Sequence, residues 1–310
     1  LALAAGVDAI QAGANVVLVT GVEVQTTHNA VIGADFLARA SHYEKERSID
    51  PFTFPAMFAR RTQAYCEKYG VTPAVLAPIV SKAYSNANRN PNAHMRSVQL
   101  TEQQAAQASD SNPCFLDNES LNPWLRLSDC SQVSDGGCAV VLCSDEGLER
   151  LGQGVDRAVE VTACSFACGP LGQVPDYTKM DVTAAAASNA YSSVGWNAKD
   201  IQVAEVHDCF SISEALICEA LGFAGAGEGA QLAAEGATTL EGNIPVNTGG
   251  GLMAFGHPVG ATGVKQAYEV FRQMNGLCGD YQLATPPRRG ICANMGGDDR
   301  TSVVTLLEKN

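Results

Sequence analysis

One histidine of the chain lies in a glycine-dense segment whose composition indicates proton-transfer chemistry. The stretch GGGLMAFGHPVGATG places His257 among six glycines between residues 249 and 263. Glycine permits tight turns and a close approach of backbone to a ligand. Pro258 suits the first turn of a helix, and the positive potential at a helix N-terminus disfavours a charged imidazole. We therefore expect a neutral His257 that accepts a proton or donates a hydrogen bond, rather than one that only satisfies a nearby carbonyl.

A second motif, VHDCFSISEAL, joins a histidine to a thiol. His207, Asp208 and Cys209 lie where an apolar strand pattern gives way to a helical one, and open sheets assemble their ligand sites at such strand ends. A thiol titrates at about 8.5, and its pKa falls beside histidine or a helix N-terminus, so Cys209 suits nucleophilic or acid/base work. Zinc binding by His207 and Cys209 is the weaker alternative, because no second cluster has ligand spacing.

A third motif, ICANMGGDDR at 291–300, carries a strand into a glycine pair. Backbone N–H groups at such a turn can form an oxyanion hole, although an ordinary tight turn explains the pattern equally well. The glycines around His257 do not form a Walker phosphate loop, because the lysine and hydroxyl residue that follow its last glycine are absent.

Strand and helix patterns alternate around these motifs. We expect strands over 15–24, 135–145, 157–167, 200–208, 289–297 and 301–309, and helices over 1–10, 146–152, 182–195, 211–223 and 262–274. This alternation predicts a largely parallel sheet covered on both faces. Residues 28–125 contain more prolines, aromatic and basic residues, and they predict a mostly helical insertion with its clearest helices at 56–70 and 72–88.

Composition limits the classes of protein. The chain has 310 residues, of which 46% are hydrophobic and 17% charged, so it is globular and has room for two domain-sized units. A net charge of −13 opposes non-specific binding to nucleic acid or anionic membranes. Eleven scattered cysteines, an odd number, indicate free thiols in a reducing compartment. No run approaches the ~18 apolar residues of a membrane span.

The three motifs, in this order and spacing, resemble the loops of the thiolase family over essentially the whole chain, as do the opening helix and the strand ANVVLVTGVE. Gly256-His257-Pro258 matches that family's Gly-His-Pro loop. His207-Asp208-Cys209-Phe210 stands in place of its Asn-Glu-Ala-Phe loop, and Asn294-Met295-Gly296 in place of its Cys-x-Gly loop. The last two departures together resemble the sterol-carrier-protein type, in which the acid/base thiol has moved to Cys209.

The resemblance implies an α/β fold with layered αβαβα architecture, in which two similar halves carry an inserted, mostly helical loop domain. It divides the chain into the remainder of the N-terminal half (1–27), the loop domain (28–125), the end of the N-terminal half (126–154) and the C-terminal half (155–310).

The resemblance also implies acyl transfer between a 3-ketoacyl-CoA and coenzyme A through a cysteine acyl-enzyme, by thiolytic cleavage or by the reverse Claisen condensation, within fatty-acid or other lipid metabolism. His257 would help to deprotonate the nucleophile and bond a thioester oxygen. His207 would donate to an oxyanion, Cys209 would move the proton of the α-carbon and the incoming thiol, and the N–H of Gly296 would complete the other oxyanion hole. Coenzyme A is then a substrate, with no permanently bound cofactor and no metal, and loop-domain arginines and lysines contact its phosphates.

In that family the nucleophilic cysteine begins the helix that opens this chain, and none of the eleven cysteines lies there. We therefore expect the nucleophile to precede Leu1, this chain to be inactive alone and the complete protein to be active. Family members are homodimers or homotetramers, and the family alone suggests a mitochondrial or peroxisomal location. The end LLEKN is not a Ser-Lys-Leu peroxisomal signal.

Two other functions stay open. A thiolase-fold protein can bind acyl-CoA or lipid without turnover. A hydrolase using Cys209 and His257 would cleave thioesters without free coenzyme A, but no Gly-x-Ser/Cys-x-Gly elbow surrounds Cys209.

Overall fold

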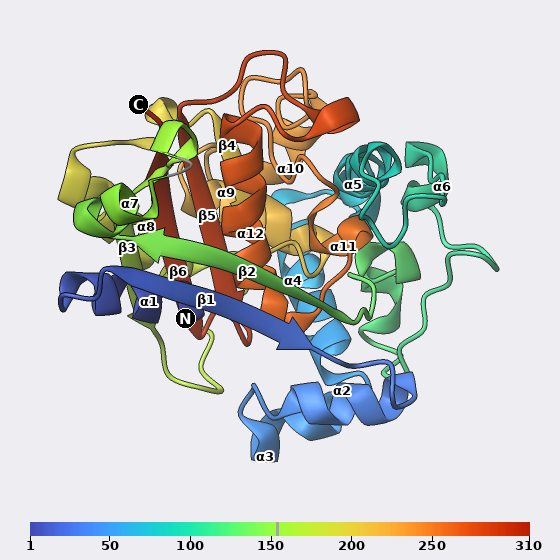
Figure 1. The fold of residues 1–310 in the computed structure, drawn as a ribbon. Helices are drawn as coiled ribbons and strands as arrows, with labels where there is room; N and C mark the ends of the chain where they lie inside the picture. The colour runs from blue at the N-terminus through green and yellow to red at the C-terminus, as the bar shows by residue number, and fades with distance from the viewer. Residues whose placement is uncertain (153–154) are drawn as a thin grey trace.

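The computed structural model describes residues 1–152 and 155–310 and contains two β-sheets (Figure 1). The smaller sheet pairs two antiparallel strands, β1 (Val16–Glu23) and β2 (Gly136–Cys143). The larger sheet has the order β3-β6-β5-β4, formed by Glu160–Cys168, Thr301–Glu308, Arg289–Gly296 and Val203–Val206. Every strand expected from the sequence is present, with ends shifted by a few residues.

The expectation of a largely parallel arrangement was wrong. Among the described strands, only β4 and β5 pair in parallel, whereas β1–β2, β3–β6 and β5–β6 are antiparallel. The sequence argument assumed a helical crossover between successive strands, but a short turn joins β5 to β6. A short turn can only return the chain antiparallel.

Helix α12 (Val259–Met274) lies between the two sheets and contacts β1, β2, β4 and β5 (Figure 1). The apolar face of α12 packs with helix α1 (Ala2–Gln11) against the larger sheet, where Leu3, Val270 and Leu307 share one buried cluster. On the other side of that sheet lie α8 (Asp181–Val194) and α9 (Ser211–Ala220). These layers confirm the expected α/β fold class.

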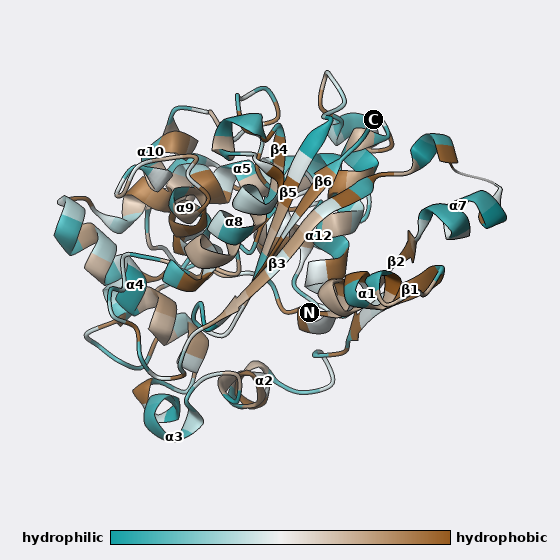
Figure 2. Ribbon diagram, turned by 90° about the vertical axis from the view of Figure 1, so that its left-hand side faces the viewer, coloured by the Kyte–Doolittle hydropathy of each residue, from teal (hydrophilic) through white to brown (hydrophobic). Residues whose placement is uncertain are grey.

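The outward face of the smaller sheet is open to solvent. Alternate residues of β1 point outward, and Leu18 and Val22 are 65% and 71% exposed. Figure 2 shows β1 as one of the most hydrophobic segments at the molecular surface. The described residues therefore leave an apolar sheet face uncovered.

The segment between β1 and β2 is mostly helical, as predicted. It contains α2 (Ala30–Ala38), α3 (Tyr43–Glu46), α4 (Thr53–Tyr69), α5 (Ala77–Arg89) and α6 (Glu102–Ala106). Helices α4 and α5 pack on α9 in the main core, so the insertion is joined to the second half by buried side chains. The helices expected over 56–70 and 72–88 correspond to α4 and to α5 with the short 3₁₀ turn Pro73–Leu76 that precedes it.

Three shorter helices complete the described chain: α7 (Asp145–Leu151), α10 (Gly229–Ala234) and α11 (Gly251–Phe255). The four domain ranges stay predictions, and the boundary at residue 154 falls outside the described residues. All eleven cysteines are described and are free thiols. In the described ranges, no helix combines the length and the apolar character that a membrane span requires.

Candidate active site

A cavity of about 500 Å³ brings the three motif loops together. All four residues expected to be catalytic from the sequence line it: His207, Cys209, His257 and Gly296. The insertion supplies a further wall of apolar side chains that includes Leu37, Phe52, Phe54, Pro55 and Phe58. The loops converge because β4 and β5 are parallel neighbours, so the residues that follow them emerge at one edge of the sheet.

His257 is half-buried, two residues before the first residue of α12. Its backbone is fixed at both ends, since its N–H donates to the Gln132 carbonyl at 3.2 Å and its carbonyl accepts from Gln25 Nε2 at 2.7 Å. The ring Nδ1 lies 2.7 Å from Thr262 Oγ1. The Thr262 hydroxyl donates to the Pro258 carbonyl at 3.1 Å, so its single proton is used there. With the hydroxyl proton directed at Pro258, we assign the ring hydrogen to His257 Nδ1, which leaves Nε2 as a proton acceptor.

The glycines near His257 serve packing between protein segments. A Cβ at Gly260 would lie 2.6 Å from the Val22 carbonyl oxygen, because the first turn of α12 crosses directly over β1. A Cβ at Gly256 would lie 2.5 Å from Ser134 Oγ. At these two positions, glycine is required for approach to protein atoms rather than to a ligand.

His207 is buried just after β4 and takes the opposite tautomer. Its Nδ1 accepts from Asn294 Nδ2 at 3.0 Å, and the same amide donates to Gln266 Oε1 at 3.0 Å. An accepting Nδ1 in a neutral ring places the proton on Nε2. The rings of His207 and His257 meet edge to face with centroids 5.0 Å apart. His207 therefore presents a hydrogen-bond donor, and His257 presents a base.

Both imidazoles are neutral. Burial lowers the pKa of His257 to about 4. Burial, with a smaller contribution from His257, also holds the pKa of His207 well below its usual range. The expected neutral state is thus present, but its cause is loss of solvent, whereas the sequence argument relied on the helix N-terminus.

Cys209 is a protonated thiol. Burial, with smaller contributions from the charges of Asp208 and Asp298, raises its pKa to about 12, and its Sγ lies 3.7 Å from Ser213 Oγ. The expectation that neighbouring histidine and helix would lower this pKa was wrong, because the neutral rings bring no charge and burial of the Cys209 side chain disfavours the thiolate. Cys130 also lines the cavity, and burial raises its pKa well above the usual value.

Gly296 ends β5 and is exposed to the cavity. Its carbonyl accepts from the N–H of Arg300 at 3.1 Å, which closes a tight turn back into β6. The next residue, Gly297, has a φ of +66°. The glycine pair read from the sequence is therefore a sharp turn whose backbone borders the same space as both histidines.

Asp208, which lies between His207 and Cys209 in the sequence, has a structural role. Its buried Oδ1 accepts from the Leu252 N–H at 2.6 Å, which ties this loop to the start of α11. Burial, reinforced by the charge of Glu214, raises the pKa of Asp208 to about 7. The carboxyl group joins two of the motif loops.

Sequence reasoning missed the residues that set the histidine tautomers. Thr262 follows His257 by about one helical turn, and that spacing was a usable signal. Gln266 and Asn294 offered none, because their partners lie far away in the sequence. In the described part of the chain, no three His, Cys, Asp or Glu side chains cluster so as to hold a metal ion.

Comparison with known proteins identifies relatives of this chain in sequence and in fold. Residues 168–309 match the family model described as thiolase C-terminal domain-like. An acetyl-CoA acetyltransferase of Methanothermobacter thermautotrophicus is 36% identical over 312 residues, which cover all of this chain and 77% of the relative. The chain belongs to the thiolase family.

Other matches agree with this thiolase assignment. Sterol carrier protein 2 of Gallus gallus is 30% identical over 78% of the chain and 43% of that protein, and this match confirms the resemblance to the sterol-carrier-protein type. The Acat5 thiolase from Ascaris suum, solved in complex with coenzyme A, has the same fold with a TM-score of 0.66 at 18% identity, over all of this chain and 76% of that one.

Proposed function

We propose that this thiolase-family protein transfers acyl groups between a 3-ketoacyl-CoA and coenzyme A. The observation that carries the proposal is the pair of neutral imidazoles with opposite tautomers, 5.0 Å apart, in one cavity with a protonated thiol. That set supplies a base, an oxyanion donor and a proton donor, which are the three groups that reversible carbon–carbon cleavage of a thioester requires.

In the proposed cleavage, Nε2 of His257 takes the proton of the attacking cysteine thiol. The oxyanion that forms at the keto carbon accepts hydrogen bonds, and the N–H of Gly296, a residue that lines the cavity, is proposed to donate one. The α-carbon then leaves as an enolate whose thioester oxygen is bonded by Nε2–H of the now protonated His257 and by Nε2–H of His207. Cys209 gives its proton to that carbon, and the resulting thiolate takes a proton from incoming coenzyme A. The sulfur of coenzyme A attacks the acyl-enzyme, and the bond to the nucleophilic cysteine breaks. The released cysteine thiolate takes its proton back from His257, which restores the resting state.

The nucleophile in this scheme is proposed from the family alone. The two cysteines that line the described cavity, Cys130 and Cys209, are both held protonated by burial. Nothing in their surroundings activates either as a resting thiolate. The acid/base assignments rest on the geometry, and the covalent step rests on membership of the family.

The insertion is proposed to receive the substrate. Its apolar wall suits an acyl chain, and basic side chains on the insertion are proposed to contact the phosphates of coenzyme A, which would offset the overall charge of −13. Coenzyme A is proposed as a substrate, and the related thiolase solved with coenzyme A supports this. Assembly as a homodimer or homotetramer, in the mitochondrion or the peroxisome, is proposed from the family.

A second candidate function is binding of acyl-CoA without turnover. The observation that favours it is that neither thiol lining the described cavity, Cys130 or Cys209, is activated as a nucleophile, whereas a protonated Cys209 fits both functions. This function predicts that the protein binds coenzyme A thioesters without cleaving or forming them.

The test is loss of acetoacetyl-CoA in the presence of coenzyme A, measured on the protein as the cell makes it. We expect turnover by wild type and a fall of at least about 100-fold in kcat for Cys209→Ala and for His257→Ala, with binding of coenzyme A retained in calorimetry. Binding without turnover of short or long 3-ketoacyl chains would establish the second candidate. Thioester loss that proceeds equally well without coenzyme A would indicate a hydrolase.

A further inference from the structure

Helix α4 of the insertion carries two side chains, one turn apart, that reach two different loops of the cavity. Phe58 lines the cavity and stacks on Phe210, with ring centroids 4.5 Å apart and planes at 20°. Phe210 directly follows Cys209 in the chain. Arg61, three residues after Phe58, is fully buried and reaches the turn that follows Gly296.

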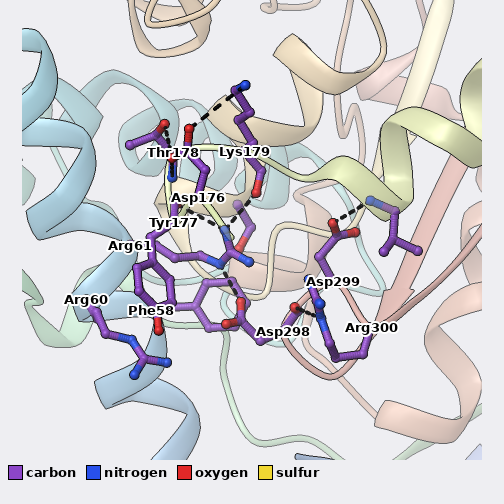
Figure 3. Close-up of polar contacts among 12 residues, drawn as sticks. Phe58, Arg60, Arg61, Asp176, Tyr177, Thr178, Lys179, Asp298, Asp299 and Arg300 are labelled. Carbon is purple, nitrogen blue, oxygen red and sulfur yellow. Dashed lines mark hydrogen bonds and ion pairs between the residues drawn. The ribbon is translucent and has the colours of Figure 1, made fainter. Parts of the chain in front are cut away.

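The hydrogen bonds of Arg61 connect three segments (Figure 3). Its Nε donates to Asp298 Oδ1, and the ion pair is buried on both sides. Its Nη1 donates to the carbonyls of Tyr177 and Lys179 at 3.0 and 2.8 Å. Among the described residues, Nη2 of Arg61 and Oδ2 of Asp298 have no hydrogen-bond partner. The contact with Asp298 is therefore a single bond.

The turn that receives this bond is held from its other side as well. Asp299 has a φ of +55°, and its carboxylate accepts from the N–H groups of Val182 and Thr183 at the start of α8, at 2.9 and 3.0 Å. Arg300 Nε donates to the Asp298 carbonyl at 2.8 Å, and Figure 3 shows these charged residues side by side. Asp298 is thus the only residue of the 296–300 turn that the described structure bonds by its side chain to the insertion.

A buried ion pair is a weak source of stability, because removing two charges from water costs about as much as their attraction returns. What such a pair supplies is a fixed geometry. Asp298 lies two residues from Gly296, so its position sets the direction of the backbone at Gly296. The charge of Asp298 is also felt at Cys209, where it helps to raise the pKa of the thiol. Both effects act on groups assigned to the reaction, although Arg61 does not line the cavity.

We propose that Arg61 is a positioning residue, which holds the Gly296 turn in the geometry that binds the oxyanion by anchoring Asp298 to α4. Phe58, on the same helix, holds the Cys209 loop by stacking, so α4 sets the distance between the proton donor and the oxyanion site. The inference rests on the proposed acyl transfer. It requires no contact between Arg61 and the substrate.

The test uses the complete protein with Arg61→Met, Arg61→Lys, Asp298→Asn and the charge-free double variant Arg61→Met/Asp298→Leu. We expect Arg61→Met to lower kcat by about 10- to 100-fold while KM for acetoacetyl-CoA stays within about threefold, since the lost geometry matters only in the transition state. Arg61→Lys should recover part of kcat, because an ammonium can keep the bond to Asp298 and loses only the carbonyl contacts. The double variant should recover stability without recovering kcat.

The matched control is Arg289→Met. Arg289 pairs with Glu308 at the opposite end of the β5–β6 pair, away from Gly296. We expect it to lower stability with no change in kcat. Hydrogen exchange supplies a readout that needs no activity: in Arg61→Met, exchange at 296–300 should rise by at least about tenfold more than in β3 or α9, and in Arg289→Met it should not.

Uniform exchange throughout Arg61→Met, or a kcat equal to that of Arg289→Met at unchanged KM, would overturn the inference. Absence of turnover in wild type would refute the proposed function, and the exchange measurement would still decide whether Arg61 holds the turn. If Arg61→Met is too unstable to assay, Asp298→Asn provides the test in its place. This variant keeps the side-chain volume and should likewise lower kcat while KM stays nearly unchanged.

Discussion

At the residue scale, His207 and His257 acquire different roles from one hydrogen bond each. The Asn294 amide nitrogen donates to His207 Nδ1, and the Thr262 hydroxyl, whose proton is directed at Pro258, is assigned as the acceptor from His257 Nδ1. Burial removes the charged form of both rings, so the tautomer is the remaining variable. The partner side chains decide which ring donates and which accepts.

Asn294→Asp should reverse the tautomer of His207. A carboxylate cannot donate, so Nδ1 would become the protonated nitrogen and Nε2 could no longer donate to an oxyanion. We expect kcat to fall by about 100-fold with binding of coenzyme A preserved, as measured by steady-state kinetics and calorimetry. The matched control, Thr262→Ser, keeps its hydroxyl and should retain most of the activity. Equal activity of Asn294→Asp and wild type would contradict the assigned tautomer.

His257 should make the protein less stable in acid. Its pKa is about 4 in the folded state against 6.5 in the unfolded chain, so the unfolded chain binds the proton more readily. The contribution of the neutral His257 ring to the free energy of unfolding is fully present above pH 6.5. It is lost as the pH falls toward 4, by about 2 kcal/mol at pH 5. His257→Gln should therefore lose less stability than wild type in urea titrations between pH 7 and 5. Parallel losses in the two proteins would show that His257 titrates normally.

At the element scale, the ends of strands and the starts of helices build the site. The sequence predicted these elements well, because they are continuous apolar or amphipathic runs with clear boundaries. His207 follows β4, the 296–297 glycine pair ends β5, and Pro258 precedes α12. The sequence did not predict which strands pair, nor that a helix of the insertion reaches Asp298 across 237 residues of sequence. Such contacts depend on which buried polar groups meet after folding, and no local pattern contains that information.

The raised pKa of Cys209 escaped prediction for a similar physical reason. Its neighbours in the sequence, His207 and a helix start, favour a thiolate. The burial that opposes them comes from segments far away in the chain, among them the insertion. Residue types indicated which groups take part, and only packing decided their protonation.

Gly251 should tolerate no side chain, because it brings α11 against the Cys209 loop. It has a φ of +61°, and a Cβ there would lie 2.0 Å from Asp208 Oδ2. We expect Gly251→Ala to lower the free energy of unfolding by at least about 3 kcal/mol, from the left-handed backbone and the displaced carboxyl group together. Urea denaturation measures the change.

Gly276→Ala is the matched control. It has a φ of +67° and nothing within 4 Å of the added carbon, so it should cost only the backbone term of about 1 kcal/mol. Equal decreases in the free energy of unfolding for the two variants would show that the Asp208 side chain moves away from the added carbon at no cost.

At the scale of the whole molecule, the uncovered face of the smaller sheet should govern behaviour in solution. Val16, Leu18, Val22 and Val141 are all about half exposed or more, on two strands that pair only with each other in the described chain. Exposed apolar faces and free strand edges promote association. We expect the 310-residue chain to self-associate with rising concentration, and Leu18→Lys to reduce this in static light scattering.

Leu277→Lys serves as the control for Leu18→Lys, because Leu277 is also exposed, at 39%, and lies on neither strand of this sheet. It should leave the association unchanged. If both variants reduced scattering alike, added charge rather than the sheet face would be responsible.

Helix α12 carries the partners of both imidazoles on one side. Thr262 and Gln266 are four residues apart, so they lie one above the other on the helix surface, the first touching His257 and the second reaching His207 through Asn294. The position of this one helix therefore fixes the hydrogen-bond partners of both rings. Adding or deleting one residue between Pro258 and Thr262 would rotate both partners by about 100° relative to the loop that holds His257, and it would displace both hydrogen bonds in one step. Single side-chain changes, in contrast, alter each ring separately.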